Sequence, residues 1–250
     1  MGRWSEPGAG LFALSVLALW RWGYPATSCA AMPVLLASVV IVAGIWHRRI
    51  LVTHALRDAV FLPDSRIRHW FTGRFAGLII ACVESLAICL GMSYFILRAT
   101  GPELWLAFGT GFATLAAMAL LRRLLAHSLR PAFALISASW IAAAVALPFC
   151  LLHIWLQMQS PTAPPYIEAG GFLDVVSASL ADLPARRDGI IEALSILRLL
   201  DAVAFWSMEQ LGDIRGIEII FVTYNAALYL AVARFAADIA CAFNAIPLRA

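Results

Sequence analysis

A single glutamate interrupts one of the most apolar stretches of this chain. Glu84 lies near the middle of residues 75–97, a run that contains no other charged side chain. A carboxyl group in that position could bind a proton or a cation. A charged side chain at the centre of a bilayer-spanning helix costs roughly 2.5–3.5 kcal/mol, so such groups usually face other helices and often serve ion or substrate pathways. Glu84 is therefore the first candidate for a functional residue.

Two hydroxyl groups are predicted to lie at the depth of this carboxyl group. Thr110 and Thr114 belong to the next apolar run, residues 104–121, which would cross the membrane in the opposite direction. Together with Glu84 they form a candidate ion or proton site. Two interpretations stay open at this point. The carboxyl group could hydrogen-bond to a hydroxyl and merely tie two helices together, or it could bind the transported ion of a transporter or channel.

A second pattern could support catalysis. His54 and Asp58 are four residues apart and share one face of a helix, where the imidazole could act as a general base in acyl or phosphoryl transfer. The same segment alternates a polar face with an apolar face, which is typical of a helix in the lipid headgroup layer. We favour the headgroup helix and predict no catalytic residue. The five cysteines lack metal-site spacing and no nucleotide-binding or hydrolase motif is present, so we expect no metal and no cofactor.

The composition explains why these residues would lie in a membrane. Hydrophobic residues make up 62 % of the 250 residues, charged residues only 13 %, and the mean hydropathy is +0.85, whereas soluble domains contain about 25 % charged residues. We predict an all-α membrane protein whose residues 1–250 form a single helical bundle. The net charge of +3 comes from arginines beside apolar runs, which is the pattern of membrane topology, so no nucleic-acid partner is expected.

Apolar runs of suitable length predict five or six transmembrane helices. The predicted spans are residues 7–22, 26–46, 75–97, 104–121, 132–155 and 217–236. Arginines cluster in residues 47–74 and 122–130, two segments that two spans separate and that must share one side of the membrane. The positive-inside rule makes that side cytoplasmic and places the C-terminus there too. Arg48, Arg49 and Arg57 would form a basic amphipathic helix that contacts anionic lipid headgroups.

Two segments allow alternative interpretations. Residues 1–22 could be a short first span or a signal peptide, and we favour the span because Arg21 lies between Trp20 and Trp22. Residues 157–216 begin with several prolines and are predicted to form an external cap. Within the cap, residues 188–211 read as a surface helix because polar side chains recur at spacing three. A further transmembrane helix is the alternative.

Stripes of small residues mark the spans for close packing. Gly73, Gly77, Ala81 and Ser85 recur every four positions, and a run of alanines at the same spacing follows in residues 134–146. The first stripe could pack within the bundle or dock a partner membrane protein. Near the end of the last span, Arg234 and Asp238 are expected to pair at the membrane interface.

These patterns favour a non-catalytic subunit or scaffold of a larger bacterial envelope complex, such as a secretion or transfer assembly, in the inner membrane. Other membrane proteins are its expected partners. A transporter or channel that uses Glu84 is the alternative function.

Overall fold

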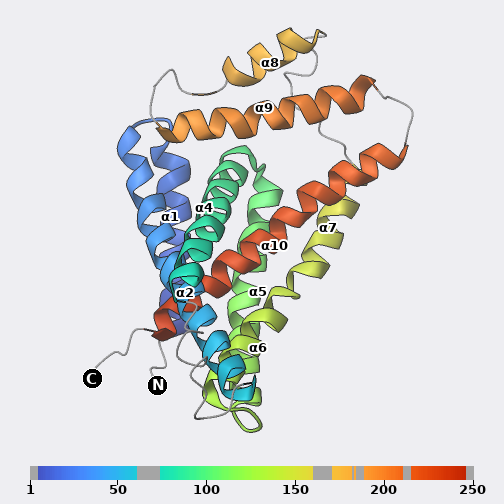
Figure 1. The fold of residues 1–250 in the computed structure, drawn as a ribbon. Helices are drawn as coiled ribbons and strands as arrows, with labels where there is room; N and C mark the ends of the chain where they lie inside the picture. Colours follow the sequence, from blue (N-terminus) through green and yellow to red (C-terminus); the bar gives the residue numbers. More distant parts are fainter. Residues whose placement is uncertain are drawn as a thin grey trace.

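The fold is a bundle of helices with two further helices across one end (Figure 1). The structure is a computed structural model that describes residues 5–60, 74–159, 171–181, 183, 189–210 and 215–245. Every regular element in these ranges is helical, which confirms the predicted all-α class. The elements are α1 (Ser5–Gly23), a 3-10 helix (Ser28–Ala30), α2 (Ala31–Val60), α4 (Arg74–Arg98), α5 (Gly101–Leu125), α6 (Pro131–Ala143), α7 (Ala146–Gln159), α8 (Phe172–Ala181), α9 (Gly189–Gln210) and α10 (Arg215–Ala245).

Five stretches in the described part of the chain are long and apolar enough to cross a membrane. They are Ala31–His54, Phe75–Arg98, Gly101–Leu125, Phe133–Gln157 and Ala226–Asn244. The chain is therefore a multi-pass α-helical membrane protein. The apolar part of α1, Gly8–Gly23, is shorter than these five. It nevertheless packs into the core, where Trp20 is buried and its indole Nε1 donates a hydrogen bond to the Ser93 carbonyl oxygen at 2.9 Å.

Helix α10 is the central element of the bundle. In its most apolar stretch 67 % of the residues are buried, whereas 22–28 % are buried in the other four spans. Helix α10 contacts α1, α2, α4, α5, α6 and α7. Its neighbours therefore surround α10 on most sides. Alanines supply much of its buried surface, so neighbouring backbones can come close. The closest approach is at Gly44 of α2, where an added Cβ would lie 2.0 Å from the Asp238 carbonyl oxygen.

The last span continues past its predicted end. The predicted span was residues 217–236, and the apolar stretch among the described residues of α10 reaches Asn244. Arg234 and Asp238 were predicted to lie at the membrane interface. In the structure Asp238 is fully buried in the bundle, so the apolar stretch continues past it.

Helix α2 is also longer than the predicted span, residues 26–46. It continues without a break to Val60, because the helix contains no proline after Pro33. Residues 47–60 are thus the end of a spanning helix rather than a separate helix after a turn. The rest of the predicted amphipathic segment, residues 61–73, lies outside the described residues.

The predicted span of residues 132–155 consists of two helices. Helix α6 ends at Ala143 and α7 begins at Ala146, and the amides of Ala144 and Val145 donate to carbonyl groups only three residues back. The proline at position 148 has no amide hydrogen, and its ring would clash with the carbonyl group four residues earlier. Pro148 therefore explains the break at this position.

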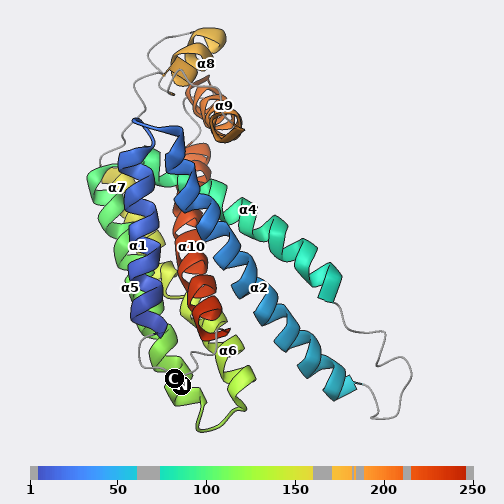
Figure 2. The ribbon, with the colours of Figure 1, turned by 90° about the vertical axis from the view of Figure 1, so that its left-hand side faces the viewer.

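The two cap helices lie across one end of the bundle. In Figure 1, α9 runs across the ends of the long helices with α8 beyond it. Helix α9 is not among the five spanning stretches found in the described residues, and its position on the membrane surface stays a prediction. The opposite end carries the end of α2, the start of α4 and the connection from α5 to α6 (Figure 2). Both arginine-rich segments are thus attached to the same end of the bundle.

Candidate functional site

Glu84 forms an ion pair with a neighbouring helix. The guanidinium group of Arg49, on α2, donates a hydrogen bond to Glu84 Oε1 on α4. The two side chains are 34 % and 39 % exposed, respectively, so the pair lies at the periphery of the bundle. Both residues fall within spanning stretches. An ion pair lowers the free energy of a carboxylate at membrane depth, because the opposite charge partly replaces the water that the carboxylate has lost.

The structure does not bring Thr110 and Thr114 to this carboxylate. Both threonines are fully buried in α5. Their hydroxyl groups each donate a 2.8 Å hydrogen bond within their own helix, Thr110 to the Leu106 carbonyl oxygen and Thr114 to the Thr110 carbonyl oxygen. This local bond satisfies a threonine hydroxyl in an apolar environment. The three residues of the predicted ion or proton site are therefore not one cluster.

A second, more deeply buried charge cluster joins α2 and α10. Arg48 donates a hydrogen bond to Asp238 Oδ1, and their side chains are 7 % and 0 % exposed. Arg234 lies one turn before Asp238, with its Nε 3.4 Å from Asp238 Oδ2. The predicted pair of Arg234 and Asp238 is present, but it lies in the bundle interior. The ring of Trp140 covers both arginines, with its centroid 5.7 Å from Arg48 Cζ and 4.6 Å from Arg234 Cζ.

The predicted lipid-facing arginines therefore differ in their surroundings. Arg48 and Arg49 point to carboxylates of neighbouring helices and not to the headgroup layer. The sequence indicates no protein partner for either arginine, because the two carboxylates lie 190 and 35 residues further along the chain. The side chains of Arg57 and Asp58 lie outside the described residues, whereas that of His54 is half-buried. Headgroup contact by this segment stays a prediction.

The small residues of α4 face α2. Ala81 and Ser85 are buried, and the Ser85 hydroxyl donates to the Ser38 carbonyl oxygen at 2.8 Å. A Cβ added to Gly77 would lie 3.9 Å from Arg49 Cβ. This part of the stripe thus serves packing within the bundle, whereas Gly73 lies outside the described residues. The second stripe, Ala134, Ala138, Ala142 and Ala146, is also buried.

A polar network that sequence analysis missed ties the cap to the bundle. Asp201, on α9, accepts hydrogen bonds from the Tyr94 hydroxyl and from Arg98 Nη1, both at 2.5 Å. Arg98 also lies over the ring of Phe205, and Arg198 donates to the Ser179 carbonyl oxygen of α8 at 3.2 Å. The signal in the sequence was the recurrence of polar side chains at spacing three in residues 188–211, which includes Asp201. That spacing predicted a surface helix, but it carried no information on which basic residue of the bundle Asp201 would meet.

A further buried polar group lies beneath the cap. Glu103 accepts hydrogen bonds from the backbone amide and the hydroxyl of Thr100, and from the Gln157 side chain. His153 Nδ1 lies 3.9 Å from Glu103 Oε1 and 3.3 Å from the Tyr229 hydroxyl. These contacts connect α5, α7 and α10 near the capped end. The cluster ties three helices together and contains only two groups that commonly bind metals.

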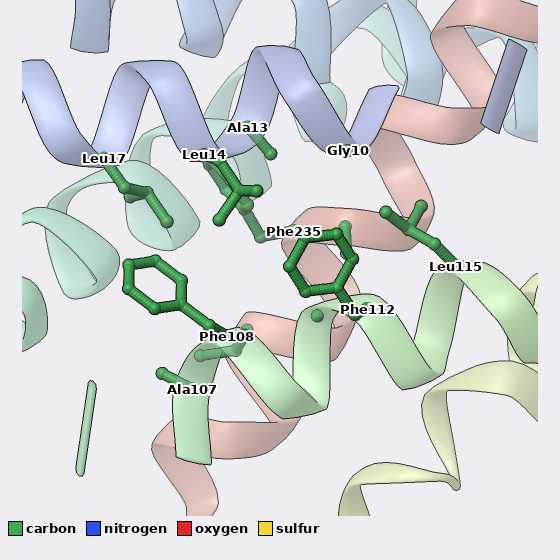
Figure 3. A pocket seen from close by; sticks show the side chains of 12 residues that line it. Gly10, Ala13, Leu14, Leu17, Ala107, Phe108, Phe112, Leu115 and Phe235 are labelled. Atoms are coloured by element: carbon green, nitrogen blue, oxygen red, sulfur yellow. The ribbon is translucent and has the colours of Figure 1, made fainter. Parts of the chain in front are cut away.

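The described hollow in the bundle is entirely apolar (Figure 3). It lies between α1, α5 and α10, and its lining residues are Gly10, Ala13, Leu14, Leu17, Ala107, Phe108, Gly111, Phe112, Leu115, Val232, Phe235 and Ala236. Such a surface provides no group for acid–base chemistry or for ion coordination. Among the described residues, no group of three or more His, Cys, Asp or Glu side chains could hold a metal ion.

Comparison with known proteins identifies no relative. No family model matches the sequence, and neither the curated proteins nor the solved structures contain a significant match.

Proposed function

We propose that the protein is a non-catalytic integral membrane subunit or scaffold of a larger bacterial envelope complex, located in the inner membrane. The observation that supports this proposal is the pairing of its charged residues between helices. Glu84, Asp238 and Asp201 each bind an arginine of another helix. They therefore act as ties between helices, which is how a protein maintains a rigid shape in the absence of a hydrophobic drive between helices in lipid.

The shape of the bundle also supports a scaffold. The cap closes one end of the bundle through Arg98 and Asp201, and the hollow of Figure 3 has no polar lining. An enzyme would need reactive groups that face a cavity, and a carrier would need polar groups along a path. A scaffold needs neither, because it functions through its outer surfaces.

A transporter or channel that uses Glu84 is the second candidate. Such a site would require the carboxylate to release Arg49 whenever it binds a cation or a proton. Substitution of Glu84 by Gln tests this function, because the variant would lose flux while the protein still accumulated. Unchanged flux in the Gln variant would exclude the carboxylate from any transport mechanism.

Extraction in a mild detergent, followed by native sizing and mass spectrometry, tests the main proposal. A subunit should be purified together with a stoichiometric set of other membrane or envelope proteins. A chain that migrates alone after several gentle extraction protocols would contradict it. A tagged soluble domain of an unrelated protein, expressed in the same cells and purified in the same way, would identify proteins that bind nonspecifically.

A further inference from the structure

The pair of Arg49 and Glu84 is unusual for its position. Charged residues in spanning helices almost always face the bundle interior or a water-filled cavity. Here each side chain keeps about a third or more of its surface exposed, although α2 and α4 are two of the five spanning elements. An ion pair that borders lipid is stabilised less well than one with further polar partners, because hydrocarbon provides none. Its position suggests that another polar surface covers it.

The surroundings of the pair are uncovered as well. Helix α4 is the least buried of the five spans, and α2 and α4 lean away from the other helices toward the end that carries the α2 C-terminus (Figure 2). Exposed residues on α4 beside Glu84 are small or apolar and include Ala76, Ile80, Val83 and Ala87. They recur at spacings of four, three and four, which is the spacing of a seam between two packed helices.

We propose that the face formed by α2 and α4 around Arg49 and Glu84 is the contact surface for a second copy of this chain. Charge complementarity supports this contact. A positive and a negative group that lie side by side on one face become their own complement when a twofold axis along the membrane normal passes between them. Arg49 of one copy then faces Glu84 of the partner copy, and Glu84 faces Arg49, so that four alternating charges replace two.

A second copy also places its charges at the same depth in the membrane as those of the first. Two identical chains inserted with the same topology bring their charges to the same level in the membrane, so no adjustment of either helix is needed. A different membrane protein would need a matching pair of opposite charges at that depth. Small residues beside the charges allow the helices of the two copies to approach closely, and this approach provides the dispersion contacts that drive helix association in lipid.

This inference rests on the proposed function, since it identifies the first partner of the subunit. Cysteine cross-linking in native membranes tests the contact directly. The five native cysteines are replaced by alanine, and Ile80→Cys is introduced next to Glu84. Leu151→Cys, on an exposed part of α7, is the matched control. We expect a disulfide-linked dimer with Ile80→Cys under mild oxidation and none with Leu151→Cys.

Exchange of charges distinguishes a contact between copies from the pair within one chain. Arg49→Glu leaves two acids at the site, whereas Glu84→Arg leaves two guanidinium groups, so both variants lose the pair within the chain. Each variant alone should form few dimers because like charges would face each other. When the two variants are co-expressed with different affinity tags, opposite charges face each other across the interface. We expect mixed dimers to exceed either homodimer by about tenfold or more.

Each result has one meaning. Ile80→Cys cross-linking together with preferential mixed dimers supports the inference. Absence of the Ile80→Cys dimer overturns it, even if the charge variants fail to accumulate, and mixed dimers no more abundant than homodimers overturn it as well. If the wild-type chain is purified with other membrane proteins but in a single copy, the inference fails while the proposed function stands. A single copy with no companion contradicts both.

Discussion

Arg48 and Asp238 are 190 residues apart in the sequence and form a buried ion pair between α2 and α10. Asp238 is fully buried, and Arg234 supports it from one helical turn away. The pair therefore connects the second helix of the chain to the last. It also lies beside Gly44, at the closest approach of the two helices, so electrostatic attraction and backbone packing act at the same place.

Removal of this carboxylate should destabilise the protein strongly. Asp238→Asn leaves Arg48 buried without an opposite charge, and the loss of one partner of a buried pair costs roughly 3–5 kcal/mol. Thermal unfolding of the purified protein in detergent would measure the effect. The triple variant Arg48→Met, Arg234→Met and Asp238→Leu is the control, and we expect it to be closer to wild type because it removes all three charges of the cluster together. Equal losses in both variants would show that packing matters more than charge.

Gly44 should not tolerate even a methyl group. An alanine Cβ would meet the Asp238 carbonyl oxygen at 2.0 Å, and relief of that overlap requires α2 and α10 to separate. We expect Gly44→Ala to reduce stability by about 1–3 kcal/mol or more. Gly91→Ala in α4 is the matched control, because nothing lies within 4 Å of its Cβ position and alanine favours a helix by up to about 1 kcal/mol. Two variants of equal stability would argue against the close contact.

Asp201 should keep the cap in place. Asp201→Ala removes the acceptor of the Tyr94 and Arg98 hydrogen bonds, and hydrogen bonds to charged groups contribute about 1.5–3 kcal/mol each. Amide hydrogen exchange in α9 should become faster by roughly tenfold or more, while exchange in α10 stays unchanged. Glu192→Ala provides the control, because this acid is exposed on the same helix. Equal exchange in the two variants would mean that apolar contacts alone hold the cap.

Reporter fusions should establish the orientation. Arginine-rich segments adjoin the end of the bundle that lacks the cap, and the positive-inside rule places them in the cytoplasm. A reporter that is active only outside the cytoplasm should be active when it is fused after Gly170. A reporter that is active only in the cytoplasm should be active when it is fused after Ala250. The reverse pattern would invert the topology, and activity of both fusions on the same side would require a different number of spans.

Much of the fold could be predicted because the relevant signals are local. Long apolar runs indicate spanning helices, the small residues at 77, 81 and 85 indicate close packing, and Pro148 marks a helix break. Each of these signals depends on residues within one helix. The all-α class and most spans were therefore accessible from the sequence.

The candidate site was harder to predict because its contacts are remote in sequence. Glu84 was recognisable as a residue whose burial in a membrane costs free energy. Nothing in its own helix indicates that its partner is Arg49 and not Thr110. Arg234 and Asp238 looked interfacial because they lie near the end of an apolar run, and their burial depends on Arg48 of another helix. Hydropathy counts each charge separately, so it carries no information on which arginine a carboxylate pairs with.

The central position of α10 has a consequence for how the protein is made. Helix α10 leaves the ribosome after the helices that surround it, and Arg48 precedes its partner by 190 residues. At about 5–20 residues per second, synthesis of the intervening chain takes roughly 10–40 seconds. During that interval α1, α2, α4 and α5 are in the membrane without the helix that organises them, and Arg48 must find temporary hydration or a lipid phosphate. Biogenesis of this bundle therefore depends on a waiting state, in which an insertase or a neighbouring protein would have its greatest effect.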